Sequence, residues 1–161
     1  MSTVRHFTAT GFVVHDNCVL LHWHPKVKAW LPPGGHIDPD EDPVQAVLRE
    51  IREEAGIEAE VVSTGPRLHL DYPTQVPPPY TIMIEDIQDP VDGFHQHIDM
   101  IYFCRPAGPV GPPRDGWVWV GDDDLASGSA LRWGELPPAS PPEDVRLLAL
   151  KAIETVSATR R

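Results

Sequence analysis

The chain has 161 residues, 41% of them hydrophobic, so it can bury the core of one globular domain, and we expect a single domain over residues 1–161. Its formal net charge of -11 argues against a nucleic-acid polymer or an anionic membrane as a partner, because both attract a basic surface. Two cysteines are too few for a disulfide framework, and residues 1–6 lack the apolar core of a signal peptide. These features favour a cytoplasmic location.

A β-hairpin is expected near the start of the chain. Phe7–Val14 and Cys18–Trp23 are apolar runs that suit strands, and Asp16-Asn17 between them is a turn signal. Trp30 follows, just before the turn sequence Pro32–Gly35. Trp30 is a candidate substrate contact, with an ordinary loop residue as the alternative.

The next stretch predicts an amphipathic helix. Asp42 is a good N-cap, Pro43 suits the first helical position, and Gln45 completes a capping-box pattern. Gly56 sits where a left-handed residue ends a helix. Apolar residues at three- and four-residue steps form one stripe that faces a core: Val44, Val47, Leu48, Ile51 and Ala55.

Glu50, Glu53 and Glu54 share a different face of this helix. Three carboxylates within one turn repel each other, so a divalent cation that binds them would explain the cluster. Oxygen ligands at this density suit Mg²⁺ or Mn²⁺. A helix that is acidic only because the whole protein is acidic is the alternative.

Residues 35–57 fit the pattern Gly-x5-Glu-x7-Arg-Glu-U-x-Glu-Glu-x-Gly-U, in which U is apolar. This pattern is the signature of the Nudix hydrolases, and the chain resembles that family at every position of it. The fixed letters are Gly35, Glu41, Arg49, Glu50, Glu53, Glu54 and Gly56. The resemblance implies an α/β fold, an α/β/α sandwich around a mixed β-sheet. It also implies metal-dependent hydrolysis of a nucleoside diphosphate linked to another moiety.

Roles for individual residues combine helix geometry with this resemblance. Glu50 and Glu54, one turn apart, are the first-choice ligands for Mg²⁺ or Mn²⁺, and the family pattern adds the backbone carbonyl of Gly34. Glu53 is either a third ligand or the base that deprotonates the attacking water. Members differ in their choice of base, so four acidic residues outside the motif are further candidates: Glu85, Asp86, Asp99 and Asp123. Glu41 and Arg49 are interpreted as a structural pair that orients the loop and the helix.

The substrate class stays open at this level. A nucleoside triphosphate, a nucleotide sugar, ADP-ribose and a dinucleotide all contain the implied linkage. A Nudix-fold module that binds such a nucleotide without cleaving it is the alternative to an enzyme. Homodimers are frequent in the family, so a homodimer is a further expectation.

Short strands and Pro-rich loops are predicted after the motif. Pro73–Pro79 and Pro106–Pro113 are the loops, and the first of them is a reasonable place to look for substrate choice. A closing helix is expected behind the capping-box pattern Ser140–Glu143, and Asp122 reads as a strand exit or helix cap, with a metal ligand or base as the alternative. The expected strands are 59–63, 67–72, 80–87, 95–103 and 116–120.

His95, His97 and Asp99 lie on one face of the strand predicted at 95–103. Positions four apart on a strand are about 13 Å distant, which is too wide for all three to bind one ion. Some Nudix members resemble this chain in having a similar His-x-His-x-Asp strand. Contact with the substrate, an exposed polar face, and an ion shared by two neighbours all remain open.

Overall fold

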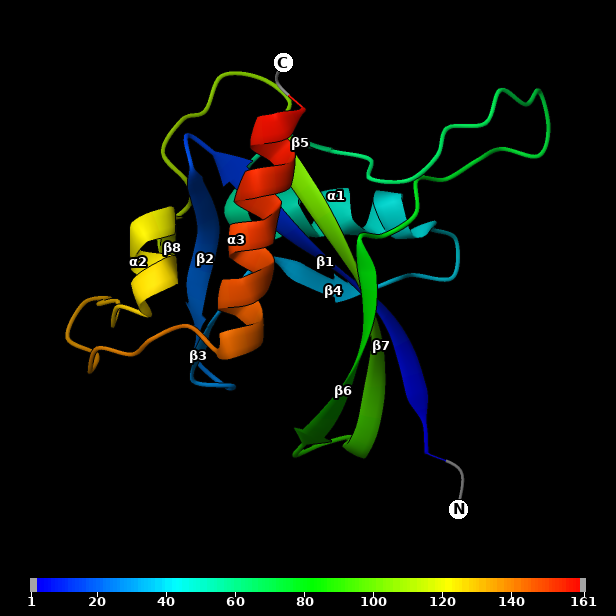
Figure 1. Cartoon of the computed structure of the whole chain (residues 1–161). Coiled ribbons are helices and arrows are strands. Elements are labelled where there is room, and N and C mark those ends of the chain that lie inside the picture. The colour runs from blue at the N-terminus through cyan, green and yellow to red at the C-terminus, as the bar shows by residue number, and fades with distance from the viewer. Residues whose placement is uncertain (1–2, 160–161) are drawn as a thin grey trace.

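The computed structural model describes residues 3–159, so residues 1–2 and 160–161 of the expected domain lie outside the described part (Figure 1). Within residues 3–159 the chain forms a β-sheet and three helices. The elements in chain order are β1 (Arg5–His15), β2 (Cys18–His24), β3 (Ala29–Leu31), β4 (Gly34–His36), α1 (Pro43–Ala55), β5 (Ala59–Val61), β6 (Thr81–Asp89), β7 (Gly93–Pro106), β8 (Trp117–Gly121), α2 (Asp122–Ser127) and α3 (Glu143–Ala158).

The strands form one mixed sheet in the order β3-β2-β1-β7-β5, with β4 paired to β1, β6 to β7 and β8 to β2. The β1–β7 pair is parallel, and the other pairs are antiparallel. In Figure 1 α3 lies in front of this sheet and α1 lies behind it. The predicted α/β architecture, with helices on both sides of a mixed sheet, is therefore confirmed.

Alternation along β1 builds the two halves of the core. Phe12 and Val14 are buried in one cluster with residues of α3, whereas Ala9 and Val13 are buried in the other with residues of α1. Neighbours in a strand point to opposite faces, which explains this division. At Gly11 an added Cβ would lie 2.8 Å from Ile51 Cδ1, so glycine lets α1 approach the sheet closely.

The predicted hairpin is present as β1 and β2. Asp16 and Asn17 have φ angles of 47° and 59°, the left-handed conformations that a tight two-residue hairpin turn requires. Two short strands that the sequence did not predict, β3 and β4, flank Pro32 and Pro33, and β4 includes the second half of the expected turn Pro32–Gly35. Pairing of β4 with β1 supplies the sheet hydrogen bonds that stabilise it.

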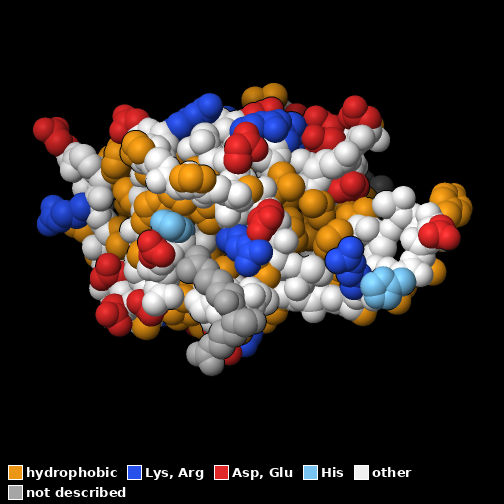
Figure 2. Space-filling model, turned by 90° about the horizontal axis from the view of Figure 1, so that it is seen from above, with side chains coloured by type: hydrophobic (Ala, Val, Ile, Leu, Met, Phe, Trp, Pro, Cys, Tyr) orange, Lys and Arg blue, Asp and Glu red, His pale blue; other side chains and the backbone are white. Residues whose placement is uncertain are grey.

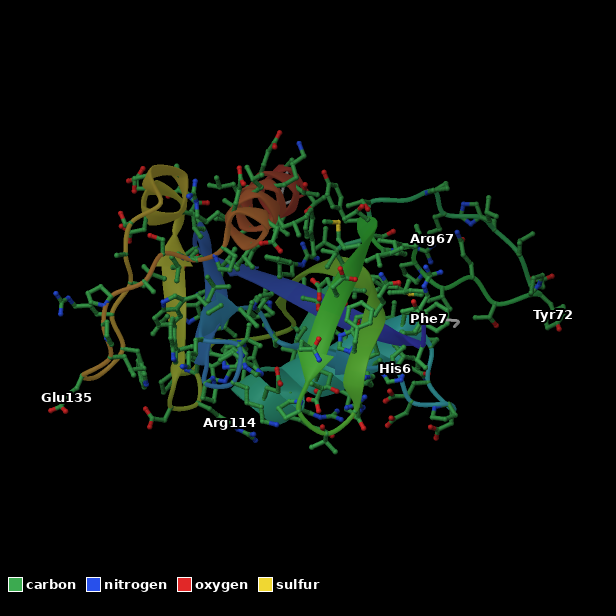
Figure 3. The ribbon with its side chains drawn as sticks, turned by 90° about the horizontal axis from the view of Figure 1, so that it is seen from below. His6, Phe7, Arg67, Tyr72, Arg114 and Glu135 are labelled. Atoms are coloured by element: carbon green, nitrogen blue, oxygen red, sulfur yellow. The ribbon has the colours of Figure 1, made fainter. Side chains whose placement is uncertain are left out.

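The strand predicted at 67–72 is wrong. Residues 62–80 contain no strand and form a loop that projects from the body of the molecule (Figure 1). Leu68 and Leu70 are exposed, and Tyr72 is 86% exposed at the outer tip of the loop (Figure 3). Apolar and polar residues alternate at 67–72, but no partner strand lies beside them, so no sheet forms. The Gln75 side chain instead accepts from the backbone amide of Leu68 and donates to the carbonyl of Pro66.

The capping box predicted at Ser140 is also wrong. α3 begins at Glu143 with Pro142 as its N-cap, and no side chain caps it. Ser140 Oγ instead donates to the Gly128 carbonyl at 2.7 Å, so this hydroxyl links two loops. No helix within residues 3–159 has both the length and the apolar character needed to cross a bilayer.

Candidate active site

The helix that contains the three glutamates begins and ends as its sequence predicts. Asp42 Oδ1 accepts from the amides of Val44 and Gln45 at 2.8 and 2.9 Å, and Gln45 Oε1 accepts from the Asp42 amide at 2.9 Å. Gly56 ends the helix in the left-handed region, at φ 71°. These caps satisfy orphan backbone groups and fix the direction in which α1 leaves β4.

Arg49 connects the helix to the loop before it. Its Nε and Nη2 donate to the carboxylate of Glu41 at 2.6 and 2.9 Å, and Nη2 also donates to the His36 carbonyl at 3.1 Å. Nη1 donates to Glu50 Oε1 at 2.8 Å. Hydrogen bonds from Arg49 lower the pKa of Glu41, so this pair is charged and joins loop and helix.

Glu54 points back toward β4. Its Oε2 accepts from the Gly34 amide at 3.2 Å, which places the carboxylate beside the backbone of the predicted ligand Gly34. Burial, together with the negative charges of Glu50 and Glu53, raises the pKa of Glu54 to about 7. A bound cation would reverse this effect, because it replaces the lost hydration and neutralises the repulsion.

Glu50 and Glu53 occupy different surroundings. The side chain of Glu50 is 15% exposed and lies against Gly35, whereas that of Glu53 is 57% exposed, 3.4 Å from Arg49 Nη1. Within residues 3–159 the three carboxylates are not among the groups whose ligand atoms all lie within 4.8 Å of one another. One ion could therefore not contact all three as they stand, and more than one ion or a side-chain rotation is needed.

The donor set nevertheless fits a hard divalent cation. Carboxylate oxygens and a backbone carbonyl are the ligands that Mg²⁺ and Mn²⁺ prefer. Among these carboxylates a cation would stabilise the charged form of Glu54 most, because burial and neighbouring negative charges disfavour that form. Glycine at position 35 leaves the space that Glu50 uses, because an added Cβ would lie 2.4 Å from Glu50 Oε1.

We expect Gly35→Ala to lower metal affinity and activity about 10- to 100-fold while leaving stability nearly unchanged. The added methyl group displaces the end of a flexible side chain rather than backbone. Gly34→Ala is the matched comparison, because its Cβ would meet the Ala9 carbonyl at 2.8 Å and should reduce the free energy of unfolding by about 1–3 kcal/mol. Metal titration by calorimetry and thermal melts of both variants check this; an equal loss of stability in both would contradict it.

A second acidic pair lies on the sheet near β4. Asp99 is 4% exposed, and its Oδ1 accepts from Thr8 Oγ1 at 2.9 Å and Thr10 Oγ1 at 3.0 Å. Burial raises the pKa of Asp99. Glu85 lies on the surface of β6, and desolvation by its neighbours together with the charges of Asp99 and Asp144 raises its pKa.

This pair is linked to the glutamate helix through β1 and β4. Thr10 is the register partner of Gly34, whose amide donates to Glu54. Asp99 and Glu54 are therefore connected through Thr10, which donates to Asp99, and through its neighbour Gly34, which donates to Glu54. Of the predicted alternative bases, Asp99 and Glu85 have raised pKa values and lie on two neighbouring, paired strands, β7 and β6. Asp123, by contrast, is exposed in the first turn of α2.

His95 and His97 do point to one face, as predicted, with their Nε2 atoms 3.2 Å apart. Their partners are not Asp99 but two histidines from the start of the chain and from β4. His6 Nδ1 lies 3.3 Å from His36 Nε2, and the His36 ring lies 5.0 Å from the ring of His97. Burial and the neighbouring histidines lower the pKa of His97 to about 4. Sequence reasoning missed His6 and His36, because the parallel β1–β7 pairing brings His6 here and the antiparallel β1–β4 pairing brings His36.

Trp30 is placed in the core, 1% exposed, with its ring packed edge-on against Trp23 at 5.9 Å. Its Nε1 has no hydrogen-bond partner among the described residues. A role for Trp30 in substrate contact stays a prediction. A pocket of about 350 Å³ lies beyond the C-terminal end of α1, lined by Gly56, Ile57, Glu58 and the loop after β7; its lining includes none of the other predicted site residues.

Comparison with known proteins agrees with this geometry. A hydrolase of the NUDIX family from Clostridium perfringens superposes with a TM-score of 0.71 and 26% identity over 94% of this chain and 98% of that one. A MutT NUDIX hydrolase from Burkholderia pseudomallei shares the fold at a TM-score of 0.54 and 22% identity, covering 94% of this chain and 98% of that one.

Sequence relatives match over a shorter part of the chain. The bis(5'-nucleosyl)-tetraphosphatase [asymmetrical] of Mus musculus is 43% identical over 56 residues, which are 34% of this chain and 38% of that protein. The aligned part therefore spans well under half of the relative. The NUDIX domain itself matches over residues 5–150, which include the whole sheet and every residue of the glutamate site. On this evidence the chain belongs to the NUDIX family.

Proposed function

We propose that the protein is a divalent-metal-dependent pyrophosphohydrolase that cleaves a diphosphate linkage in a nucleoside diphosphate joined to another moiety. The observation that carries the proposal is the carboxylate of Glu54, half-buried beside the Gly34 backbone with its pKa raised to about 7. Burying such a group is unfavourable for the protein unless a cation binds there. The intact motif around it supports hydrolysis rather than binding alone.

Each residue of the site then has a definite task. Glu50, Glu54 and the Gly34 carbonyl would hold Mg²⁺ or Mn²⁺, and Arg49 keeps Glu50 in place from the side. The bound ion lowers the pKa of water and neutralises negative charge on the phosphate chain. Glu53, exposed beside these ligands, is free to serve as a further ligand or to accept the proton of the attacking water. Glu85 and Asp99 are the alternative acceptors, because a carboxylate whose pKa is raised accepts a proton more readily than an ordinary one.

Dinucleoside polyphosphates are the first substrates to test. The curated relatives in mouse, rat and pig are asymmetrical bis(5'-nucleosyl)-tetraphosphatases, and a solved neighbour from Streptococcus suis is an ADP-ribose pyrophosphatase. Asymmetrical cleavage of a dinucleoside tetraphosphate adds one water and yields a mononucleotide and a nucleoside triphosphate. Cleavage of ADP-ribose would instead yield AMP and a sugar phosphate.

The experiment is a panel of nucleoside triphosphates, nucleotide sugars, ADP-ribose and dinucleotides, with Mg²⁺ or Mn²⁺ and product analysis by chromatography. Turnover in ¹⁸O-labelled water identifies which phosphorus is attacked, because the label stays on that product. Turnover of at least one class that stops on chelation supports the proposal. Tight binding with no turnover across the panel would instead favour the nucleotide sensor.

Stability of the metal-free protein should depend on pH through Glu54. Its folded pKa of about 7 exceeds the 4.5 of an ordinary glutamate, so the folded state binds more protons than the unfolded state between these values. The free energy of unfolding therefore falls as pH rises through this window. After allowance for solvent screening, the contribution is about 1–2 kcal/mol.

Comparison with Glu54→Gln isolates this effect, because His22 and His97, whose pKa values are lowered to about 4, act in the opposite sense. At pH 8 with a chelator, we expect Glu54→Gln to be about 1–2 kcal/mol more stable than the wild type. The difference should narrow at pH 5. Denaturant unfolding at both pH values measures it, and a difference that does not change with pH would contradict the assignment.

Three expectations from the sequence remain proposals. A homodimer would find an apolar surface on the exposed side of the sheet, where Phe7, Ile82 and Ile84 are each more than half exposed. Figure 2 shows that the loop of residues 62–80 projects from the body with hydrophobic side chains at its end. A cytoplasmic location, and a partner that is a small nucleotide rather than a nucleic-acid polymer, are likewise proposed.

A further inference from the structure

Four of the chain's eight histidines gather at one place outside the glutamate site. His95 and His97 come from β7, His6 from β1 and His36 from β4, and neighbouring rings lie 4.8 to 5.2 Å apart. His6 lies beside the strands of the β6–β7 hairpin in Figure 3. Register explains the gathering, because His6 is the direct partner of His97 in the parallel β1–β7 pair.

The nitrogen atoms of this cluster have the spacing of metal ligands. Ligand atoms of His6, His95 and His97 all lie within 4.8 Å of one another. The Nε2 atoms of His95 and His97 are 3.2 Å apart. Two imidazoles bound to one tetrahedral Zn²⁺ at about 2.0–2.1 Å would have nitrogens about 3.3 Å apart. The His6 side chain is only partly buried, so its ring has room to turn toward such an ion.

The hydrogen-bond partners of Nδ1 in His95 and His6 also suit metal binding through the other ring nitrogen, Nε2. His95 Nδ1 lies 3.2 Å from the Gly93 carbonyl, so an Nδ1–H donor there leaves the Nε2 lone pair directed at His97. His6 Nδ1 can donate in the same way to His36 Nε2 at 3.3 Å, which leaves its own Nε2 unprotonated. A ligating histidine typically donates its other N–H to a fixed acceptor, which orients the ring.

We propose that His6, His95 and His97 bind one Zn²⁺ or a similar transition-metal ion, at a site separate from the carboxylates of α1. Three imidazoles are a poor site for Mg²⁺, which prefers oxygen, and a good one for Zn²⁺, Co²⁺ or Ni²⁺. Three protein ligands leave the fourth tetrahedral position open to water or to a phosphate oxygen.

The surroundings of the cluster favour a cation. Glu85 is the register partner of His97 across the β6–β7 pair, so both side chains point to the same face of the sheet. Asp89 lies close enough to His95 for their charges to interact. The cluster also touches the signature motif, since the carbonyl of His36 accepts from Arg49. An ion here would join the start of β1 to the start of β7.

Titration of the tag-free, chelator-treated full chain with Co²⁺ tests the proposal, because tetrahedral Co²⁺ has visible d–d absorption bands. We expect one Co²⁺ per chain in the presence of excess Mg²⁺, displaced by Zn²⁺. His97→Ala and His6→Ala should each weaken binding at least about tenfold. His69→Ala, which changes an exposed histidine of the 62–80 loop, should bind as the wild type does.

Glu54→Gln separates this site from the proposed catalytic one. It should keep the Co²⁺ bands although it loses hydrolysis, so loss of the proposed function does not affect the result. A second readout is the melting temperature, which Zn²⁺ should raise in the wild type and in Glu54→Gln but not in His97→Ala. Circular dichroism shows whether each variant folds, and His6→Gln replaces His6→Ala if the latter does not. Folded wild-type protein without Co²⁺ bands, or unchanged affinity in both His6 and His97 variants, would overturn the proposal.

Discussion

Replacing Glu54 with glutamine is expected to lower kcat about 100- to 1,000-fold with every substrate that the protein cleaves. The amide has almost the same size and can still accept from the Gly34 amide, so the fold and the contact to β4 are kept. What disappears is the negative charge that the metal needs. The measurement is steady-state hydrolysis with saturating Mg²⁺ or Mn²⁺, alongside metal affinity by calorimetry.

Glu58→Gln is the matched control. It makes the same chemical change at an exposed glutamate just after α1, and its activity should match that of the wild type. Because Glu54→Gln should also be the more stable protein at pH 8 without metal, its inactivity could not be attributed to unfolding. Activity of Glu54→Gln within threefold of the wild type would remove Glu54 from the catalytic site.

Arg49→Ala is expected to lower the free energy of unfolding by about 2–3 kcal/mol, which corresponds to a melting temperature about 5–10 °C lower. The side chains of Arg49 and Glu41 are only 20% and 15% exposed, so removal of the guanidinium leaves Glu41 and Glu50 without a partner. The His36 carbonyl loses a donor as well. Activity should fall too, because Glu50 loses the contact that orients it. Thermal melts and steady-state kinetics measure the two effects.

Arg105→Ala provides the comparison. Arg105 Nε lies 2.6 Å from Glu60 Oε1, as short a contact as that of Arg49 to Glu41, but the two side chains are 38% and 51% exposed. Exposed pairs contribute about 0–1 kcal/mol, so this variant should melt within about 3 °C of the wild type. An equal fall in melting temperature in the two variants would mean that burial does not determine how much the ion pairs of Arg49 stabilise the protein.

Features determined by neighbours along the chain could be predicted from the sequence. The caps Asp42 and Gly56, the position of α1 and the pairing of Arg49 with Glu41 all depend on residues at most a few turns apart. The sequence spacing of these residues is therefore enough to predict them. The hairpin turn at Asp16-Asn17 is predictable for the same reason.

Features that depend on distant pairing could not be predicted. Nothing in the sequence aligns His6 with His97, because parallel pairing of β1 with β7 is a property of the whole sheet. Alternation along the strand placed Asp99 on the face of His95 and His97, but its hydrogen bonds from Thr8 and Thr10 on β1 depend on the same distant pairing. For the same reason the alternation at 67–72 predicted a strand, although no neighbouring strand is there to receive it.

The parallel pair of β1 and β7 also determines the order in which the molecule can assemble. Thr8 and Asp99, joined across this pair, are separated by 91 positions in the chain. During synthesis β1 can form its hairpin with β2 early. The edge of β1 that pairs with β7 stays unpaired until β7 has left the ribosome. Closing so long a loop is entropically costly, so this pairing should limit the folding rate. Until then the half-finished edge of β1 is the part of the nascent protein most open to aggregation.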